Sequence, residues 1–405
     1  MKHKHTLLLL ITLLIILLPS SSYANEMLPD ETLSDEFLSD ELLSDEFLPD
    51  SALAIPTNEH VKAKVIEIID EKRGLDYGGG MSVDVQTFKV EILTGEHKGK
   101  ILISENTMLG NPAYDLWVTA GDKVLLVLET SSDGVLNGYL MDYARDTYIF
   151  ILLGLFILLL IVIGRSQGLK AVITLGITIF LIGKFMLPLL FRGYDPVLLA
   201  LITSLAASTI TFVTITGWTK KSIAATLGTI GGLAAAAILS IIVSKLANLR
   251  GLSDEEAQML LYIPQGIDFN FQGLLLAGII IGALGAVMDV SMSIASSMDE
   301  INKKIPNLSF KELVTSGMNV GKDIMGTMSN TLILAYTGAS IPLLLLLMAY
   351  EQPFVKLINM DFLATEFVRA LCGSIGLILA IPITAVIAGF LLNQDNVEQT
   401  EKSVD

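Results

Sequence analysis

Long apolar runs separated by short polar loops dominate the sequence from residue 147 onward. They cover residues 147–163, 171–190, 196–216, 223–244, 273–297, 327–349 and 368–392. Each run reaches or approaches the roughly 20 residues that a helix needs to cross a hydrocarbon core. With 52% hydrophobic and only 17% charged residues, the composition argues against a purely soluble protein. We therefore predict a membrane all-α helical bundle of about seven spans at residues 146–393, followed by a C-terminal tail at 394–405.

The N-terminus has the features of a secretory signal. Lys2 and Lys4 form a basic start, residues 7–18 are apolar, and small residues lead to Ala24. The apolar run is short for a spanning helix, whereas a basic start, a short apolar run and a small-residue end are typical of a signal peptide. We predict a signal peptide at residues 1–24, cleaved after Ala24. An uncleaved anchor is the alternative.

Residues 25–58 read as an acidic leader. Residues 26–50 contain ten acidic side chains and no Lys or Arg, and the sequence Leu-Ser-Asp-Glu-Phe recurs there every five residues with small changes. A period of five gives no single apolar face to a helix or a strand, and like charges repel one another. We predict an extended, disordered spacer. A calcium- or partner-binding role is the alternative.

Residues 59–145 change to short β-rich runs separated by glycine and Asn-Pro turn signals. The runs cover 61–69, 82–93, 100–104, 123–130 and 134–141. Five strands in about 80 residues favour a small antiparallel β-barrel of the OB type. Because acids outnumber bases in this segment, we interpret it as a structural or protein-contact domain, with an envelope protein as candidate partner, and not as an oligonucleotide-binding domain. The net charge of −16 likewise argues against nucleic acid.

An exported signal peptide would place this β domain outside the membrane. Seven spans then leave the C-terminus in the cytoplasm. The predicted inner loops carry eight Lys or Arg residues against six in the outer segments, which agrees modestly with the positive-inside rule.

Small residues recur every fourth position in two of the predicted spans. The run at 223–244 contains Ala224, Gly228, Gly232, Ala236 and Ser240, and the run at 273–297 contains Gly278 and Gly282. Such stripes let a neighbouring backbone come close. Tight helix packing and a sliding interface are the two interpretations.

Polar side chains inside the apolar runs are the candidates for function, because an ionisable group at membrane depth is costly and usually faces protein or water. Asp289 stands in an apolar, glycine-rich run, about 24 Å along a helix from Gly273. A proton-coupling role and a structural role are both open for it. Candidate pathway residues are Ser204, Ser208, Thr211, Asn330 and Lys184. The hydroxyls can instead bond to their own helix, and Lys184 can snorkel to the surface.

Two further features of the sequence are an amphipathic segment and a single cysteine. Residues 309–318 form an amphipathic pattern that predicts a helix lying on the membrane between two spans. One cysteine, Cys372, permits no internal disulfide and no Cys-based zinc site. No arrangement typical of an intramembrane enzyme is present in the spans, so we expect neither enzymatic activity, nor a metal, nor a cofactor.

The segments LLLAGIIIGALGAVMDVSMSIASSMDEI, from Leu274, and SGMNVGKDIMGTMSNTLILAYTG, from Ser316, resemble the YibE/F family of multi-spanning membrane proteins. VEILTGEHKGK and GDKVLL in the β domain fit the exported N-terminal part of that family. The resemblance covers roughly residues 60–390. It implies a bacterial plasma-membrane protein of the permease type, without naming a substrate.

Asp289 also occupies a place similar to the proton-carrying Asp of resistance–nodulation–division transporters. The first hypothesis is therefore a permease or transport component that is proton-coupled through Asp289. The alternative is a membrane scaffold or accessory protein whose β domain binds an envelope partner. Assembly with further copies or other subunits is open in both.

Overall fold

The protein consists of two compact units, which a computed structural model describes for residues 59–76, 82–131, 135–263, 266–305, 308–350 and 353–402. The units divide at Leu158 and Leu159, and each is described by itself. The predicted signal peptide (1–24) and the whole of the predicted acidic leader (25–58) lie outside the described residues.

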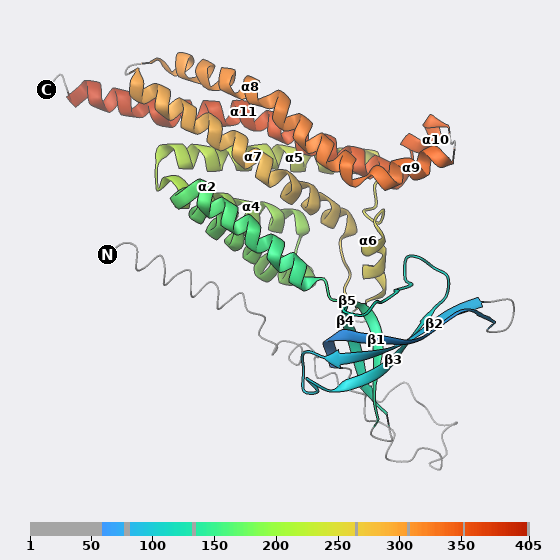
Figure 1. Ribbon diagram of the computed structural model, residues 1–405. Coiled ribbons are helices and arrows are strands. Elements are labelled where there is room, and N and C mark those ends of the chain that lie inside the picture. The colour runs from blue at the N-terminus through green and yellow to red at the C-terminus, as the bar shows by residue number, and fades with distance from the viewer. Residues whose placement is uncertain are drawn as a thin grey trace, which may run out of the picture. The chain divides into compact units, whose positions relative to one another are not determined.

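The first unit is built around a five-stranded antiparallel sheet (Figure 1). Its strand order is β3-β2-β1-β4-β5, and the strands are β1 (Glu59–Asp76), β2 (Ser82–Ile92), β3 (Ile101–Met108), β4 (Lys123–Thr130) and β5 (Leu136–Tyr143). Alternate residues of β1 and β4 face the core, among them Val61, Val65 and Leu126, as a period of two requires. The five predicted strands are thus confirmed, and β1, with 18 residues, is nine residues longer than expected.

The prediction of a closed barrel is wrong. No backbone ladder joins β3 to β5 in the described part of the sheet. The two edge strands approach each other, and Ser104 Oγ donates to the Gly138 carbonyl oxygen at 2.5 Å. This side-chain contact connects the two edges where a closed barrel would have a backbone ladder, and the sheet is an open one.

The second unit is helical. Its main helices are α2 (Asp146–Phe180), which starts in the first unit, α4 (Pro196–Thr216), α5 (Lys220–Leu246), α7 (Phe271–Lys304), α8 (Phe310–Ala339) and α11 (Asp361–Lys402). Shorter segments are η1 (Leu181–Met186), α3 (Leu187–Phe191), α6 (Glu255–Met259), η2 (Leu260–Tyr262), α9 (Ile341–Ala349) and α10 (Phe354–Ile358). Among the described residues, five helical segments are long and apolar enough to cross a membrane, or six if the bent pair α8–α9 counts as one. This number is lower than the expected seven, partly because two predicted spans fall in one segment.

The first two predicted spans fall in one helical segment, Asp146–Phe191. That segment is interrupted at Arg165, whose φ of 48° and ψ of −124° are not helical. A Cβ atom added at Gly168 would lie 1.8 Å from the carbonyl oxygen of Leu160, although eight residues of straight helix would separate the two by about 12 Å. The chain therefore turns back sharply at Arg165, and only glycine fits at position 168.

The helix widens into the π-helical segment η1 just before Pro188. Proline lacks an N–H group, so the carbonyl of Lys184 has no donor in an ordinary α-helical pattern. A π-helical turn is one way to accommodate this loss.

The expected surface helix at 309–318 is not a separate element. Ser309 caps a single helix that runs from Phe310 to Ala339, and the start of the expected span at 327 lies inside it. This helix then bends by 58° into α9. Pro342 stands at the start of α9 and cannot continue the hydrogen bonding of α8.

Helices α5, α7 and α11 form the centre of the helical unit, with α4 and α8 packed onto them. Figure 1 shows α7, α8 and α11 running alongside one another. Their buried side chains form one apolar cluster that includes Leu233, Ile280, Val287 and Leu377.

Candidate functional site

Helix α7 fixes the position of Asp289. The helix begins after Asn270, whose Oδ1 accepts a hydrogen bond from the Gly273 amide at 2.8 Å. One face of α7 is buried along almost its whole length, from Leu275 to Met298. Asp289 lies on the opposite, exposed face with Gly282 and Gly285, at the i, i+3 and i+7 spacing that aligns residues along a helix.

Helix α8 runs antiparallel to α7 beside this face. Gly317 lies against Met298, Gly321 against Ile294, and the Tyr336 hydroxyl against Gly282. By this register Asp289 lies level with residues 326–329 of α8.

Two hydroxyl groups on α8 lie level with this stretch of α7: Ser329 by the helix register, and Tyr336 by its contact with Gly282. The oxygen atoms of Ser329 and Tyr336 are both shielded from solvent and unpaired within the described residues. We refer to Gly282, Asp289, Ser329 and Tyr336 as the α7–α8 seam. Asp289 itself makes no hydrogen bond or ion pair with any described residue, so the seam has acceptors and donors available for water or a proton.

Ser204, Ser208 and Thr211 lie on α4, away from the seam. Ser204 and Ser208 are fully buried, and α4 packs mainly against α5 and α7. Ser208 donates to its own helix at the Leu205 carbonyl, at 3.2 Å, whereas the Ser204 hydroxyl has no partner in the described chain. Thr211 is half-buried.

The remaining two polar candidates are exposed on other elements. Lys184 lies in η1, which packs against α3 and α4. Asn330 lies on the outer face of α8. The structure therefore does not gather the predicted pathway residues into one channel.

The small-residue stripe of α5 faces α11. A Cβ atom added at Gly232 would lie 2.6 Å from the Cβ of Ala380 and 2.8 Å from the carbonyl oxygen of Gly376. At Gly228 it would lie 1.9 Å from Thr384 Oγ1. The other three members of the stripe, Ala224, Ala236 and Ser240, are fully buried.

The stripe of α7 is different, because Gly278 and Gly282 are both exposed. A Cβ atom at Gly278 would meet no other atom within 4 Å. At Gly282 the nearest atom is the Tyr336 hydroxyl oxygen, 2.6 Å away.

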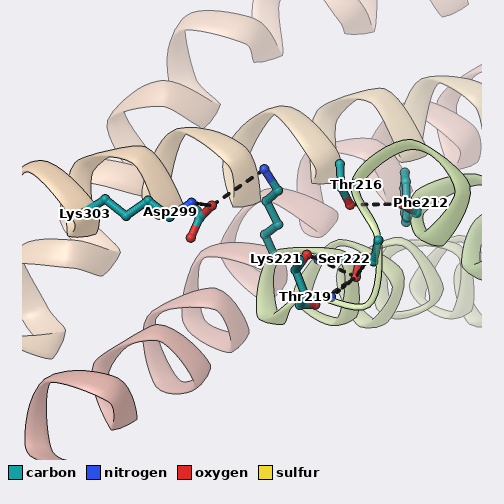
Figure 2. A network of polar contacts seen from close by, with 8 residues as sticks. Phe212, Thr216, Thr219, Lys221, Ser222, Asp299 and Lys303 are labelled. Atoms are coloured by element: carbon teal, nitrogen blue, oxygen red, sulfur yellow. Dashed lines mark hydrogen bonds and ion pairs between the residues drawn. The ribbon is translucent and has the colours of Figure 1, made fainter. Parts of the chain in front are cut away.

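An ionic cluster joins α5 to the last turns of α7 (Figure 2). Asp299 Oδ2 lies 2.7 Å from Lys303 Nζ and 3.6 Å from Lys221 Nζ. Beside it, Thr219 and Ser222 form the capping box that starts α5. The Asp299 side chain is 13% exposed and has two cationic partners, which contrasts with the unpaired Asp289 two to three turns away on the same helix.

Two buried hydroxyls that the sequence did not single out also meet between helices. Thr384 Oγ1 of α11 donates to Ser291 Oγ of α7 at 3.2 Å. Ser291 follows Asp289 by two residues and so points to the opposite side of α7, into the bundle. In the sequence, the only signal for this position was the spacing of two residues from Asp289, which places Ser291 on the opposite side of the helix.

The β unit holds its long β3–β4 connection by side-chain contacts. Gln86, almost fully buried, bonds to both the amide and the carbonyl of Val118. Arg73 stacks over the Trp117 ring at 4.5 Å. On the outer surface, apolar side chains of the edge strands are about half exposed or more: Ile101, Ile103, Tyr139 and Met141.

Both parts of the chain match models of one protein family. Residues 152–394 match the YibE/F-like protein model, and residues 57–143 match the N-terminal domain of the YibE/F family. The chain belongs to the YibE/F family. No curated protein and no solved structure matches it significantly. Family membership and the apolar helices together indicate a membrane protein.

Proposed function

We propose that this YibE/F protein is a permease or transport component whose cycle is coupled to protonation of Asp289. The observation that carries the proposal is an unpaired carboxyl group on the exposed face of an apolar helix, about 24 Å along α7 from Gly273. An ionised carboxylate at such a depth costs a few kcal/mol or more, so intramembrane acids generally mark ion or proton pathways.

The protonation cycle uses the groups of the α7–α8 seam. A proton on Asp289 removes the charge, which allows this face of α7 to lie in an apolar environment. When the seam opens to water, the proton leaves and the carboxylate is solvated. The unpaired hydroxyls of Ser329 and Tyr336 can then donate hydrogen bonds to the carboxylate or to a bridging water.

The packing of the helices indicates which parts move. The α5–α11 contact is closed by glycines that admit no added side chain, so α5 and α11 form a rigid pair. The outer face of α7 and the outer half of α8 have fewer close neighbours. We propose that α8 moves relative to α7 as Asp289 changes its protonation state.

A hydrophobic carbodiimide tests the first step, because such reagents modify protonated carboxyl groups in apolar surroundings. Membranes containing the full chain are treated across a pH series, and peptides are quantified by mass spectrometry. We expect modification of Asp289 to persist toward neutral pH, whereas Asp268, exposed in the loop before α7, loses its reactivity. Absence of Asp289 modification at every pH, with its peptide clearly detected, would contradict the proposal.

Proton flux tests the second step. The wild-type chain and Asp289→Asn are reconstituted into liposomes with a trapped pH-sensitive dye, and a pH gradient is imposed. We expect proton movement with the wild type and its loss in Asp289→Asn. Equal fluxes from the two proteins would remove Asp289 from the coupling mechanism.

The exposed apolar side chains of β3 and β5 favour a second candidate function, that of a scaffold for an envelope protein. Apolar side chains gathered on a soluble surface are typical of protein contacts. The two functions separate experimentally: partner capture that survives Asp289→Asn but is lost on charging the patch with Ile103→Glu supports the scaffold.

A further inference from the structure

Helix α8 presents a polar stripe on its outer face. Asn319, Asp323, Gly326 and Asn330 are all exposed, and their spacing of i, i+4, i+7 and i+11 places them in one line along the helix. Lys322 is also exposed and flanks the same line. The side chains of Asn319, Lys322, Asp323 and Asn330 have no hydrogen bond or ion pair to any described residue.

The stripe runs from the charged inner end of α7, where Asn319 lies level with residues 296–299, into the apolar run of that helix. The antiparallel register against α7 places Asn330 level with residues 285–288, in the middle of the apolar run of α7, and Lys322 and Asp323 about 10 Å farther toward the inner end. Lipid tails cannot satisfy an amide or a charged group at this depth.

The outward-facing surfaces of α4, α5 and α11 are apolar, as lipid contact requires. Their exposed residues include Leu198, Ile202, Leu205, Ile223, Leu227, Ile238, Ile242, Leu371, Ile375, Leu379, Val386 and Phe390. The outer face of α8 differs from these three surfaces, and its composition suits contact with protein.

We propose that this stripe pairs with the same stripe on a second copy of the chain, around a twofold axis along the membrane normal. Such an axis brings equivalent residues together at equal depth. Asn330 and Asn319 each carry a donor and an acceptor, so each amide can bond to its own equivalent across the axis. Asparagine in this role is a known determinant of helix pairing in membranes and coiled coils.

In this arrangement, the charges on the stripe of one copy are complementary to the charges on the stripe of the other copy. Lys322 and Asp323 lie about 100° apart around the helix, with Gly326 and Asn330 between them, so Asp323 forms one edge of the stripe and Lys322 flanks its other edge. A twofold axis places the left flank of one helix against the right flank of the other, so Lys322 of each copy faces Asp323 of its partner copy, as g and e residues do in a parallel coiled coil. Gly326 lies between them with open space around its Cα, which permits close approach of the two backbones.

Site-directed crosslinking tests the pairing in native membranes. In a Cys372→Ser background of the full chain, Gly326→Cys keeps all polar members of the stripe, and a short bis-maleimide is added. We expect a crosslinked dimer, with at least about tenfold less from Leu371→Cys, which is exposed on α11 and serves as the matched control. Absence of the Gly326→Cys dimer, or an equal yield at position 371, would overturn the proposal.

Charge exchange tests the reciprocal ion pairs. Lys322→Asp or Asp323→Lys alone places like charges across the axis, and we expect each to lower the dimer yield about tenfold. The double variant Lys322→Asp/Asp323→Lys restores opposite charges and should regain the wild-type yield. A double variant as weak as the single ones, or single variants as strong as wild type, would exclude the proposed geometry.

This pairing is independent of the proposed proton coupling. Asp289→Asn should dimerise like the wild type, so failure of either proposal leaves the other measurable.

Discussion

Small residues occur on two surfaces of the helical unit, and their surroundings differ completely. Between α5 and α11, Gly232 and Gly376 lie so close to the opposite helix that an added Cβ atom would overlap with its atoms. On the outer faces of α7 and α8, Gly278, Gly285 and Gly326 have no atom within 4 Å of an added Cβ. Glycine therefore permits close helix contact between α5 and α11, whereas on the outer faces of α7 and α8 no helix packs against it. The effect of a small residue depends on whether another helix lies against it.

The largest effect is expected at the closed interface. Gly232→Leu forces a side chain into the space of Ala380 and the Gly376 carbonyl, and overpacking of this kind costs about 3 kcal/mol or more. The thermal midpoint of the helical unit in detergent, followed by circular dichroism, should fall by roughly 6–12 °C. Gly278→Leu is the matched control and should shift it little. Equal shifts for the two variants would remove the distinction between the two surfaces.

A smaller loss is expected at Gly228, where the nearest atom is the hydroxyl oxygen of Thr384. Gly228→Ala displaces that side chain and breaks its bond to Ser291, which should lower the free energy of unfolding by about 1–2 kcal/mol. Thr384→Ala removes the hydroxyl oxygen, which is the nearest clashing atom, while Cβ of residue 384 remains at 2.8 Å. The double variant should therefore lose less than the sum of the single losses. Strict additivity in denaturant unfolding would show that the two positions do not interact.

At the open surface, replacing glycine should raise the stability instead of lowering it. Gly285→Ala adds a methyl group where nothing lies within 4 Å, and alanine is favoured over glycine in a helix by up to about 1 kcal/mol. We expect a small rise of the thermal midpoint, in contrast to a fall for Gly232→Ala. A fall for Gly285→Ala would reveal a close neighbour at this surface and would count against the open face.

The smallest effect concerns a carboxylate that, unlike Asp289, has a strong partner. In the β unit the Arg145 guanidinium bonds to Asp142, and this bond together with the Tyr143 amide lowers the pKa of the Asp142 carboxyl. A lowered folded-state pKa contributes stability above the unfolded-state pKa of about 4, and that contribution is lost as the pH falls further. Asp142→Asn should therefore flatten the loss of stability slightly between about pH 5 and 2, measured by Trp117 fluorescence. An unchanged pH profile would mean that solvent screening removes the stabilising effect of this ion pair, which is largely exposed.

Local patterns predicted most of the elements. The β-rich runs and their turn signals predicted five strands, and the apolar runs predicted α4 at its observed bounds and α5 within three residues. They also predicted α7 and α11, which extend up to seven and ten residues beyond the predicted ends. The two arms on either side of Arg165 were also visible as separate apolar runs. These features depend on side chains close in sequence, so the sequence carries them directly.

Long-range features were less accessible. The expected surface helix at 309–318 is part of α8, where Gly317 lies against Met298 of α7 and Gly321 against Ile381 of α11 and Ile294 of α7. The predicted barrel is an open sheet, whose edge strands are connected by a bond from Ser104 to Gly138. Both outcomes involve contacts between residues distant in the chain, which local patterns do not encode.

By itself, the sequence determined that Asp289 stands in an apolar helix and that small residues line α5 and α7. Only the tertiary structure decided that the α5 stripe is buried against α11 while the face with Asp289 is exposed beside the Ser329 and Tyr336 hydroxyls. The reason is geometric. Helical spacing fixes which residues share a face, but the packing of other helices decides which face is covered.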